Sequence, residues 1–162
     1  LQLQTIIERH NGTLRQFIVD DKGCVLIALF GCHGSHSLNQ ASNAVRMALV
    51  VKKKFRKIDN ANVSIGVTTG RVFCGTVGNT SRREYAVVGD SVNRAARLMG
   101  KAKHDILIDF ETMQDCSDSI RVEKLPTINL KGIKNRVLVY RPIHVLGERS
   151  SYVAHSDVSD FE

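Results

Sequence analysis

The segment EYAVVGDSVNRAARLMG, residues 84–100, places an asparagine and an arginine one helical turn apart, directly after an apolar stretch and a Gly-Asp turn. Side chains at positions i and i+4 of a helix are neighbours along one edge. A carboxamide can both donate to and accept from a sugar hydroxyl, and a guanidinium can bind a phosphoryl group through two parallel hydrogen bonds. Asn93 and Arg97 therefore indicate a site for a phosphorylated sugar. Loop capping by Asn93 and a surface ion pair of Arg97 are the structural alternative.

The helix that must hold this pair is expected at residues 91–99, ended by Gly100. At about 100° per residue, the apolar side chains that share the face expected to pack on a sheet are Val92, Ala95, Ala96 and Met99. The polar pair lies at the edge of that face, where a rigidly held side chain can reach a cleft. Arg94 is expected to point to solvent, and either Asp90 or Ser91 can cap the first turn.

Helical and strand patterns alternate along the rest of the chain. The expected helices are residues 1–10, residues 40–55 and a short turn at 111–116. The expected strands are 13–19, 24–31, 63–70, 71–78, 85–89, 105–110, a segment near 121–125, and 138–143. Turn residues predict a hairpin between the first two strands, the second of them well buried, and a tight Thr-Gly turn joins 63–70 to 71–78. This alternation predicts an α+β fold, a mostly antiparallel sheet with helices packed on it.

The composition suits one globular domain with an apolar core, because the chain has 162 residues, 43% of them hydrophobic and 24% charged. No apolar run approaches the roughly 18 residues of a membrane span, and the N-terminus has no signal-peptide pattern. The first residues resemble the middle of a helix, so we expect a piece of a longer polypeptide. The net charge of +7 predicts an anionic partner such as a nucleotide, a nucleic acid or a lipid surface.

The four cysteines are far apart and lack the paired spacing of a zinc site. We therefore expect free thiols in a reducing compartment, which places the protein in the cytoplasm. A basic nucleic-acid-binding domain is the least favoured class, since the strands offer mainly Phe30, Phe73 and Tyr85 and no RNA-recognition signature. His33 and His36 have no acidic partner in view and receive no catalytic role.

Four motifs occur together at specific spacings. They are the strand pair IGVTTG and VFCGTVG, the strand-turn-helix YAVVGDSVNRAARL, the DKGC hairpin before an apolar strand ending in Phe30-Gly31, and the late segment LKGIKNRVLVYRP. Together these motifs resemble the catalytic domain of the class III nucleotide cyclases, and the details are most similar to the second catalytic half of soluble, bicarbonate-responsive adenylyl cyclases. The resemblance covers residues 1–145 and implies a ferredoxin-like cyclase domain without its first strand and helix. Residues 146–162 are expected to form a disordered tail.

The resemblance implies an enzyme that converts ATP into 3′,5′-cyclic AMP and pyrophosphate. In this family two halves pack head to tail, and two divalent ions, Mg²⁺ or Mn²⁺, organise the phosphates. One half carries two metal-binding aspartates. The other half offers an asparagine for the ribose and an arginine for the charge of the transition state. Asn93 and Arg97 match this second role.

The metal side of the family pattern is missing from this sequence. The chain begins after the position of the first aspartate, and Cys24 occupies the place of the second. Because a thiol is a poor Mg²⁺ ligand compared with a carboxylate, no metal ligand is assigned to this chain. Asp20 and Asp21 are the alternative ligands, and turn formation is their plainer role.

The positions that bind the base also differ from the family pattern. Gln16 and Ala86 stand where members that use ATP commonly have a lysine and an aspartate or threonine. Gln16 can hydrogen-bond an adenine edge, and Val87 can offer backbone groups, whereas no glutamate of the kind expected for guanine is present. Lys131 and Lys134 lie near the place of a phosphate-facing lysine, with a surface role as the alternative for each. Two halves also form a second pocket, at which soluble cyclases accept bicarbonate.

The function expected from the resemblance is therefore one half of an adenylyl cyclase catalytic core, inactive without the partner half that supplies the aspartates. The alternative is a catalytically inactive regulatory or nucleotide-binding module that keeps the cyclase fold. The missing metal ligands and the altered base-binding positions leave this alternative open.

Overall fold

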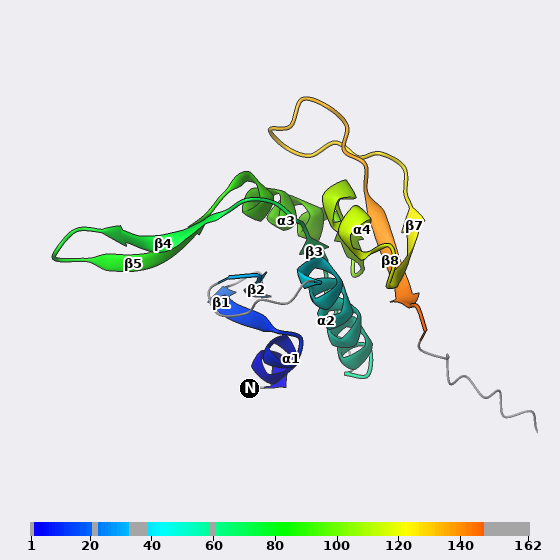
Figure 1. Cartoon of the computed structure of the whole chain (residues 1–162), viewed down its shortest axis with the longest axis horizontal. Coiled ribbons are helices and arrows are strands. Elements are labelled where there is room, and N and C mark those ends of the chain that lie inside the picture. Colours follow the sequence, from blue (N-terminus) through cyan, green and yellow to red (C-terminus); the bar gives the residue numbers. More distant parts are fainter. Residues whose placement is uncertain (1, 21–22, 33–38, 59–60, 148–162) are drawn as a thin grey trace, which may run out of the picture.

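The computed structural model describes residues 2–20, 23–32, 39–58 and 61–147. Its helices are α1 (Gln2–Arg9), α2 (Gln40–Phe55), α3 (Asp90–Lys101) and α4 (Phe110–Cys116). Its strands are β1 (Gly12–Asp20), β2 (Gly23–Phe30), β3 (Ile65–Val67), β4 (Phe73–Gly78), β5 (Arg83–Val88), β6 (Ile106–Ile108), β7 (Ile120–Lys124) and β8 (Tyr140–Val145) (Figure 1). The predicted α+β class is confirmed.

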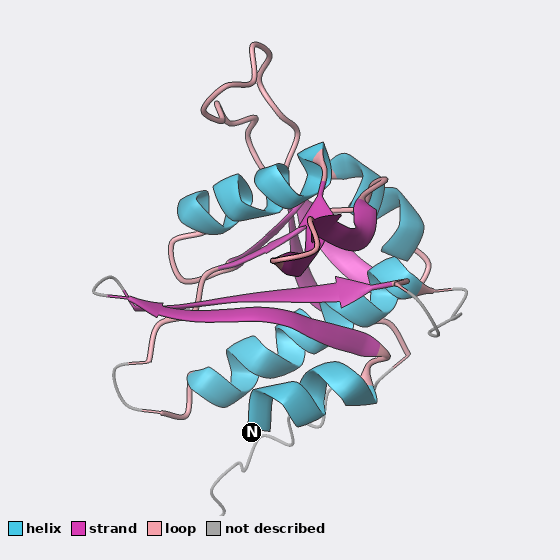
Figure 2. Ribbon diagram, turned by 90° about the vertical axis from the view of Figure 1, so that its left-hand side faces the viewer, coloured by secondary structure: helices cyan, strands magenta, loops and turns pink. Residues whose placement is uncertain are grey.

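Four strands form a central sheet in the order β3-β6-β8-β7, in which only the β3–β6 pair is parallel. Successive side chains of a strand point to opposite faces, and all three residues of β6 are buried. Ile106 and Ile108 pack in one core cluster with Val45 of α2. Leu107, between them, packs in another with Leu98 of α3. The two helices therefore cover opposite faces of the sheet, and Figure 2 shows strands lying between helices above and below them.

Two hairpins stand outside this sheet. β1 pairs antiparallel with β2, which confirms the first predicted hairpin, and α1 and α2 pack against it through Ile7 and Met47. The prediction that its second strand is well buried is wrong, because β2 is half-buried at best and Cys24 is exposed. Only one face of this hairpin is covered by helices. The second hairpin, β4–β5, extends away from the body of the molecule (Figure 1).

The prediction that a tight turn joins residues 63–70 to 71–78 is wrong. β3 is a short strand that pairs with β6, and β4 pairs with β5 instead. The threonines between β3 and β4 bond to other elements: Thr68 Oγ1 donates to the Ser91 carbonyl oxygen at 2.8 Å, and Thr69 Oγ1 lies 2.9 Å from Thr112 Oγ1. These bonds hold Thr68 and Thr69 against α3 and α4, so this segment does not fold back as a hairpin.

The described part of the chain ends just after β8, where the Leu146 N–H donates to the Ser119 carbonyl oxygen at 2.8 Å. Most of the tail predicted at 146–162 lies outside the described residues, as do His33 and His36. Among the described residues, no helix has the length and apolar character needed to cross a membrane.

Candidate functional site

The helix α3 carries Asn93 and Arg97, and a glycine sets its distance from the sheet. A Cβ added at Gly66 of β3 would lie 2.1 Å from the Ala95 carbonyl oxygen and 2.7 Å from the Met99 nitrogen. Both atoms belong to the backbone of α3, so no side chain fits between helix and strand here. Gly66 thus lets α3 rest directly on the sheet, and the polar pair is held by a rigid element.

The first turn of α3 differs from its predicted capping. Gly89 is the N-cap residue, and no side-chain hydrogen bond caps the helix, so the prediction that Asp90 or Ser91 does so is wrong. Asp90 lies in the first turn instead, where a carboxylate interacts favourably with the helix dipole. The Ser91 carbonyl oxygen accepts the hydrogen bond from Thr68, which ties this turn to the segment after β3.

The buried face of α3 is rotated from the one the sequence predicts. Ala95 contacts the sheet as expected, but Ala96 is exposed, and Leu98 is completely buried. Leu98 packs with Leu130 and Val139, residues of the C-terminal segment. The rotation follows because α3 is covered by that segment as well as by the sheet, and periodicity within one helix cannot show a second contact.

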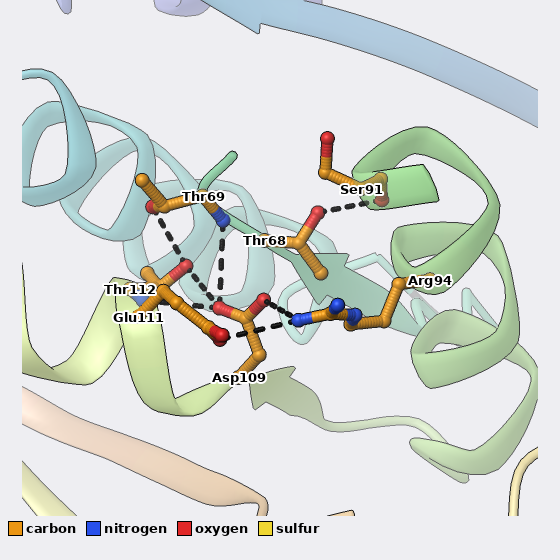
Figure 3. A network of polar contacts seen from close by, with 7 residues as sticks. All are labelled: Thr68, Thr69, Ser91, Arg94, Asp109, Glu111 and Thr112. Atoms are coloured by element: carbon orange, nitrogen blue, oxygen red, sulfur yellow. Dashed lines mark hydrogen bonds and ion pairs between the residues drawn. The ribbon is translucent and has the colours of Figure 1, made fainter. Parts of the chain in front are cut away.

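Arg94 is the largest departure from the predicted helix face, because it takes part in a buried polar network (Figure 3). Its Nη1 atom lies 3.2 Å from Asp109 Oδ2 and 3.2 Å from Glu111 Oε2. Only 1% of the Asp109 side chain is exposed, against 29% for Arg94. The prediction that Arg94 points to solvent is therefore wrong, since a buried carboxylate at the start of α4 requires a positive partner.

Asp109 caps α4 from within the protein interior. Its Oδ1 atom accepts hydrogen bonds from the Thr112 N–H at 3.0 Å, the Thr112 hydroxyl at 2.6 Å and the Thr69 N–H at 3.4 Å. Burial raises the pKa of Asp109, and the bonds from Thr112 offset that effect only in part. Asp109, directly before the helical segment 110–116, is an N-cap signal that can be read from the sequence. The pairing with Arg94 has no such local signal.

Asn93 and Arg97 occupy the same edge of α3, as predicted. Asn93 is exposed and Arg97 half-buried, and within the described part of the chain no hydrogen bond or ion pair involves either side chain. A Cβ added at Gly132 would lie 3.4 Å from Arg97 Nη2, so the turn around Gly132 passes beside the guanidinium. Lys131 and Lys134 are exposed on this same turn. The structure thus brings the two lysines into the neighbourhood of Arg97, although they lie more than thirty residues away in the sequence.

The predicted base-binding residues come from two different hairpins. Gln16 is exposed on β1, next to a β-bulge, whereas Ala86 and Val87 are half-buried on β5. The guanidinium of Arg15 lies over the ring of Tyr85, with its carbon 5.4 Å from the ring centroid. Arg15 precedes Gln16 and Tyr85 precedes Ala86, so this contact brings the two segments together.

The described residues do not fit a divalent metal ion. They contain no cluster of three or more histidine, cysteine, aspartate or glutamate side chains that could hold one. Cys24, which follows Gly23 on β2, is an exposed thiol, and thiolates favour softer metals than Mg²⁺. The side chains of Asp20 and Asp21 lie outside the described residues.

An open hollow of about 290 Å³ lies beside the polar network. Its lining residues are Arg94, Phe110, Glu111, Ile133, Asn135, Arg136, Val137 and Leu138. Asn93 and Arg97 are not among them. The polar pair therefore lies on the surface of α3 and outside this hollow.

The known proteins that this chain resembles in sequence include nucleotide cyclases. The sequence profile described as Adenylate and Guanylate cyclase catalytic domain matches residues 3–143. Adenylate cyclase type 10 of Oryctolagus cuniculus and that of Homo sapiens are each 34% identical over 143 residues, which is 87% of this chain and 9% of theirs. Adenylate cyclase 1 of Rhizobium meliloti is 26% identical over 153 residues, 87% of this chain and 22% of its own. The chain thus spans a small fraction of these relatives.

Solved structures agree with the sequence comparison. The adenylyl cyclase CyaB from P. aeruginosa superposes with a TM-score of 0.73 at 25% identity, over 88% of this chain and 77% of that one. The guanylyl cyclase Cya2 superposes with a TM-score of 0.74 at 26% identity, over 93% and 78% of the two chains.

Proposed function

This chain belongs to the adenylate and guanylate cyclase catalytic domain family, the class III nucleotide cyclases, and from that membership we propose that it is one half of an adenylyl cyclase catalytic core. The observation that carries the proposal is the edge of α3. There a half-buried guanidinium and an exposed carboxamide lie one turn apart with no partner among the described residues. Both side chains are therefore available to a ligand that approaches from solvent. We propose that this ligand is a nucleotide.

Each polar residue of the proposed site has a chemical task. Asn93 binds the ribose by donating and accepting hydrogen bonds, which orients the 3′-oxygen toward the α-phosphorus. Arg97 stabilises the negative charge that redistributes over the α-phosphate oxygens as the cyclic ester forms and pyrophosphate leaves. Because α3 rests directly on β3 at Gly66, both groups are positioned before the substrate binds. Lys131 and Lys134, on the turn beside Arg97, are proposed to face the remaining phosphates.

The partner half is proposed to complete the site in a head-to-tail dimer. No carboxylate cluster for a metal ion is found among the described residues, so we assign both Mg²⁺ or Mn²⁺ ions to aspartates of the partner. Gln16, Ala86 and Val87 are proposed to bind the adenine, and ATP is the preferred substrate because the chain resembles adenylyl cyclases. Bicarbonate is proposed to bind the second pocket between the halves.

The proposal is tested by mixing this chain with a class III half that carries both aspartates and measuring cyclic AMP formed from ATP. We expect turnover only in the mixture, and a fall of about a hundredfold or more with Arg97→Ala, as for one lost transition-state donor. Asn93→Ala should reduce turnover as well. The matched control is Arg121→Ala, an exposed arginine on β7. Near-normal turnover of the Arg97→Ala mixture would contradict the role of Arg97.

A second candidate is a catalytically inactive, nucleotide-binding regulatory module. The observation that favours it is the exposed Cys24 at the position where the family places a metal-binding aspartate. The same mixture separates the two candidates. Saturable ATP binding without cyclic AMP would support the module, whereas turnover that depends on Arg97 would support the catalytic half.

A further inference from the structure

Two cysteines that are distant in the sequence meet in this fold. Cys32 lies two positions after the end of β2, and Cys74 lies on β4, at a sequence separation of 42. Their sulfur atoms are 3.4 Å apart, so one thiol donates a hydrogen bond to the other. Both side chains are half-buried. By contrast, Cys24 is exposed and Cys116 lies in the main core cluster, so the close pair is specific to Cys32 and Cys74.

We propose that Cys32 and Cys74 are a redox-modification site that forms a reversible intramolecular disulfide. A disulfide bond is about 2.0 Å long, so the two sulfur atoms, now 3.4 Å apart, must approach by roughly 1.4 Å. Cys32 is not held inside a regular element, because β2 ends at Phe30. Its side chain can therefore move toward β4 without breaking a strand or a helix.

The oxidant is of the peroxide class, and the reaction balances without any other reagent. The thiolate of one cysteine attacks an oxygen of hydrogen peroxide, the O–O bond breaks, and a sulfenic acid and one water form. The second thiolate attacks that sulfur, the S–O bond breaks, and hydroxide leaves with a proton as a second water. Two thiols and one peroxide thus give one disulfide and two waters. A small thiol reductant reverses the bond by thiol–disulfide exchange.

The surroundings of Cys32 make it a slow nucleophile at neutral pH. Burial, followed by the hydrogen bond with Cys74, raises the pKa of Cys32 to about 11. Because the thiolate is the nucleophile, little of Cys32 is reactive near neutrality.

The disulfide would join the segment that follows the first hairpin to the second hairpin. β1 carries Gln16 on the first hairpin, and Cys74 pairs across the second hairpin with Val87 of β5. A bond between Cys32 and Cys74 would tie these two segments covalently near the Arg15–Tyr85 contact. If the proposed adenylyl cyclase function holds, the tie restricts the residues assigned to the adenine, but the disulfide itself does not depend on that function.

The test is oxidation of the purified chain with hydrogen peroxide, followed by alkylation of free thiols and mass spectrometry of peptides. We expect two of the four thiols to be lost and one linked peptide pair that contains Cys32 and Cys74, restored by a thiol reductant. Cys32→Ser and Cys74→Ser should each abolish the linked pair. The matched control, Cys24→Ser, should leave it unchanged. Sulfinic acids at Cys32 or Cys74, or links only between separate molecules, would overturn the proposal.

A second measurement guards against misfolded variants and separates this proposal from the proposed function. Circular dichroism should show the same fold for both serine variants, and hydrogen exchange of β1 and β4 amides should slow severalfold on oxidation of the unmodified chain alone. Equal exchange before and after oxidation, with the linked peptide present, would overturn the claim that the hairpins are tied. Cyclic AMP formation by the mixed halves is measured separately, so its absence would count against the proposed function and leave the disulfide result intact.

Discussion

The α3 region and the two hairpins differ in how closely they are packed against the rest of the chain. α3 touches β3 at Gly66 without an intervening side chain, and its Arg94 is paired inside the fold with Asp109. The hairpins instead expose large apolar side chains, among them Phe17 at 54% and Val88 at 61%. Exposed apolar side chains of this kind are available for contact with another surface. Arg94 is thus held by packing within this chain, whereas the hairpins leave large apolar side chains uncovered.

This difference agrees with the proposed division of labour between two cyclase halves. Groups that stabilise a transition state must be held rigidly before the substrate arrives. The hairpins carry the residues assigned to the base, and they are only half-covered in a single copy.

The largest effect is expected for Gly66→Ala. Its Cβ would meet backbone atoms of α3 at 2.1 Å and 2.7 Å, and backbone cannot move aside as a side chain can. We expect a loss of about 3 kcal/mol or more in the free energy of unfolding, measured by urea denaturation. Gly100→Ala is the matched control, since nothing lies within 4 Å of its added Cβ and alanine favours a helix interior. Equal stability of the two variants would show that α3 does not rest on β3.

Asp109→Ala tests the buried network. Thr112 would lose the acceptor of two hydrogen bonds, and Arg94 would lose its buried partner. We expect a loss of about 2 kcal/mol, because Arg94 remains partly exposed to water.

The control for the network is Glu111→Ala, which removes the other partner of the same arginine. Glu111 is 52% exposed, so its ion pair should contribute less than about 1 kcal/mol. If both variants lose the same stability, the network does not anchor α3.

A smaller effect on stability, which depends on pH, is expected from Asp105. This residue precedes β6 and forms ion pairs with Lys52 of α2 and Arg141 of β8. Burial alone would raise its pKa, but the hydrogen bond from Lys52 and the charges of Lys52 and Arg141 outweigh burial, so the pKa lies below its ordinary value of 3.8. A group with a lowered folded-state pKa stabilises the protein above the unfolded-state value, and this stability is lost as the pH falls through the folded-state value.

We therefore expect the unmodified chain to exceed Asp105→Asn in unfolding free energy by about 1 kcal/mol near neutral pH. The difference should disappear in acid, below the folded-state pKa. Urea denaturation of both proteins at a series of pH values measures it. A difference that grows on acidification would contradict the sign of the shift.

The smallest effect on stability is expected in the hairpins. Val88→Ser changes a side chain that is 61% exposed, so the unfolding free energy should change by no more than about 0.5 kcal/mol. Association with a cyclase half that carries the aspartates should nevertheless weaken, as measured by analytical ultracentrifugation of the mixture. Ile143→Ser, on β8 of the central sheet and 46% exposed, is the matched control and should leave association unchanged. Equal association of both variants would remove the hairpins from the proposed interface.

The features that the sequence predicts best are those that depend on residues close together in the chain. The bounds of α2 agree with the structure to within one residue at each end, and the first hairpin forms from the predicted strands. Asn93 and Arg97 share a helix edge as predicted, because an i, i+4 relation follows from helix geometry alone. The roles of these two residues in catalysis stay predictions.

The sequence alone therefore determined the order of helices and strands, the cyclase motifs and the spacing of the polar pair. Three further features follow from tertiary packing: β3 pairs with β6, Arg94 turns inward to Asp109, and Cys32 meets Cys74. Each of these contacts joins segments that are distant in the chain. Local periodicity carries no information about such contacts, since they follow from the packing of whole elements against one another.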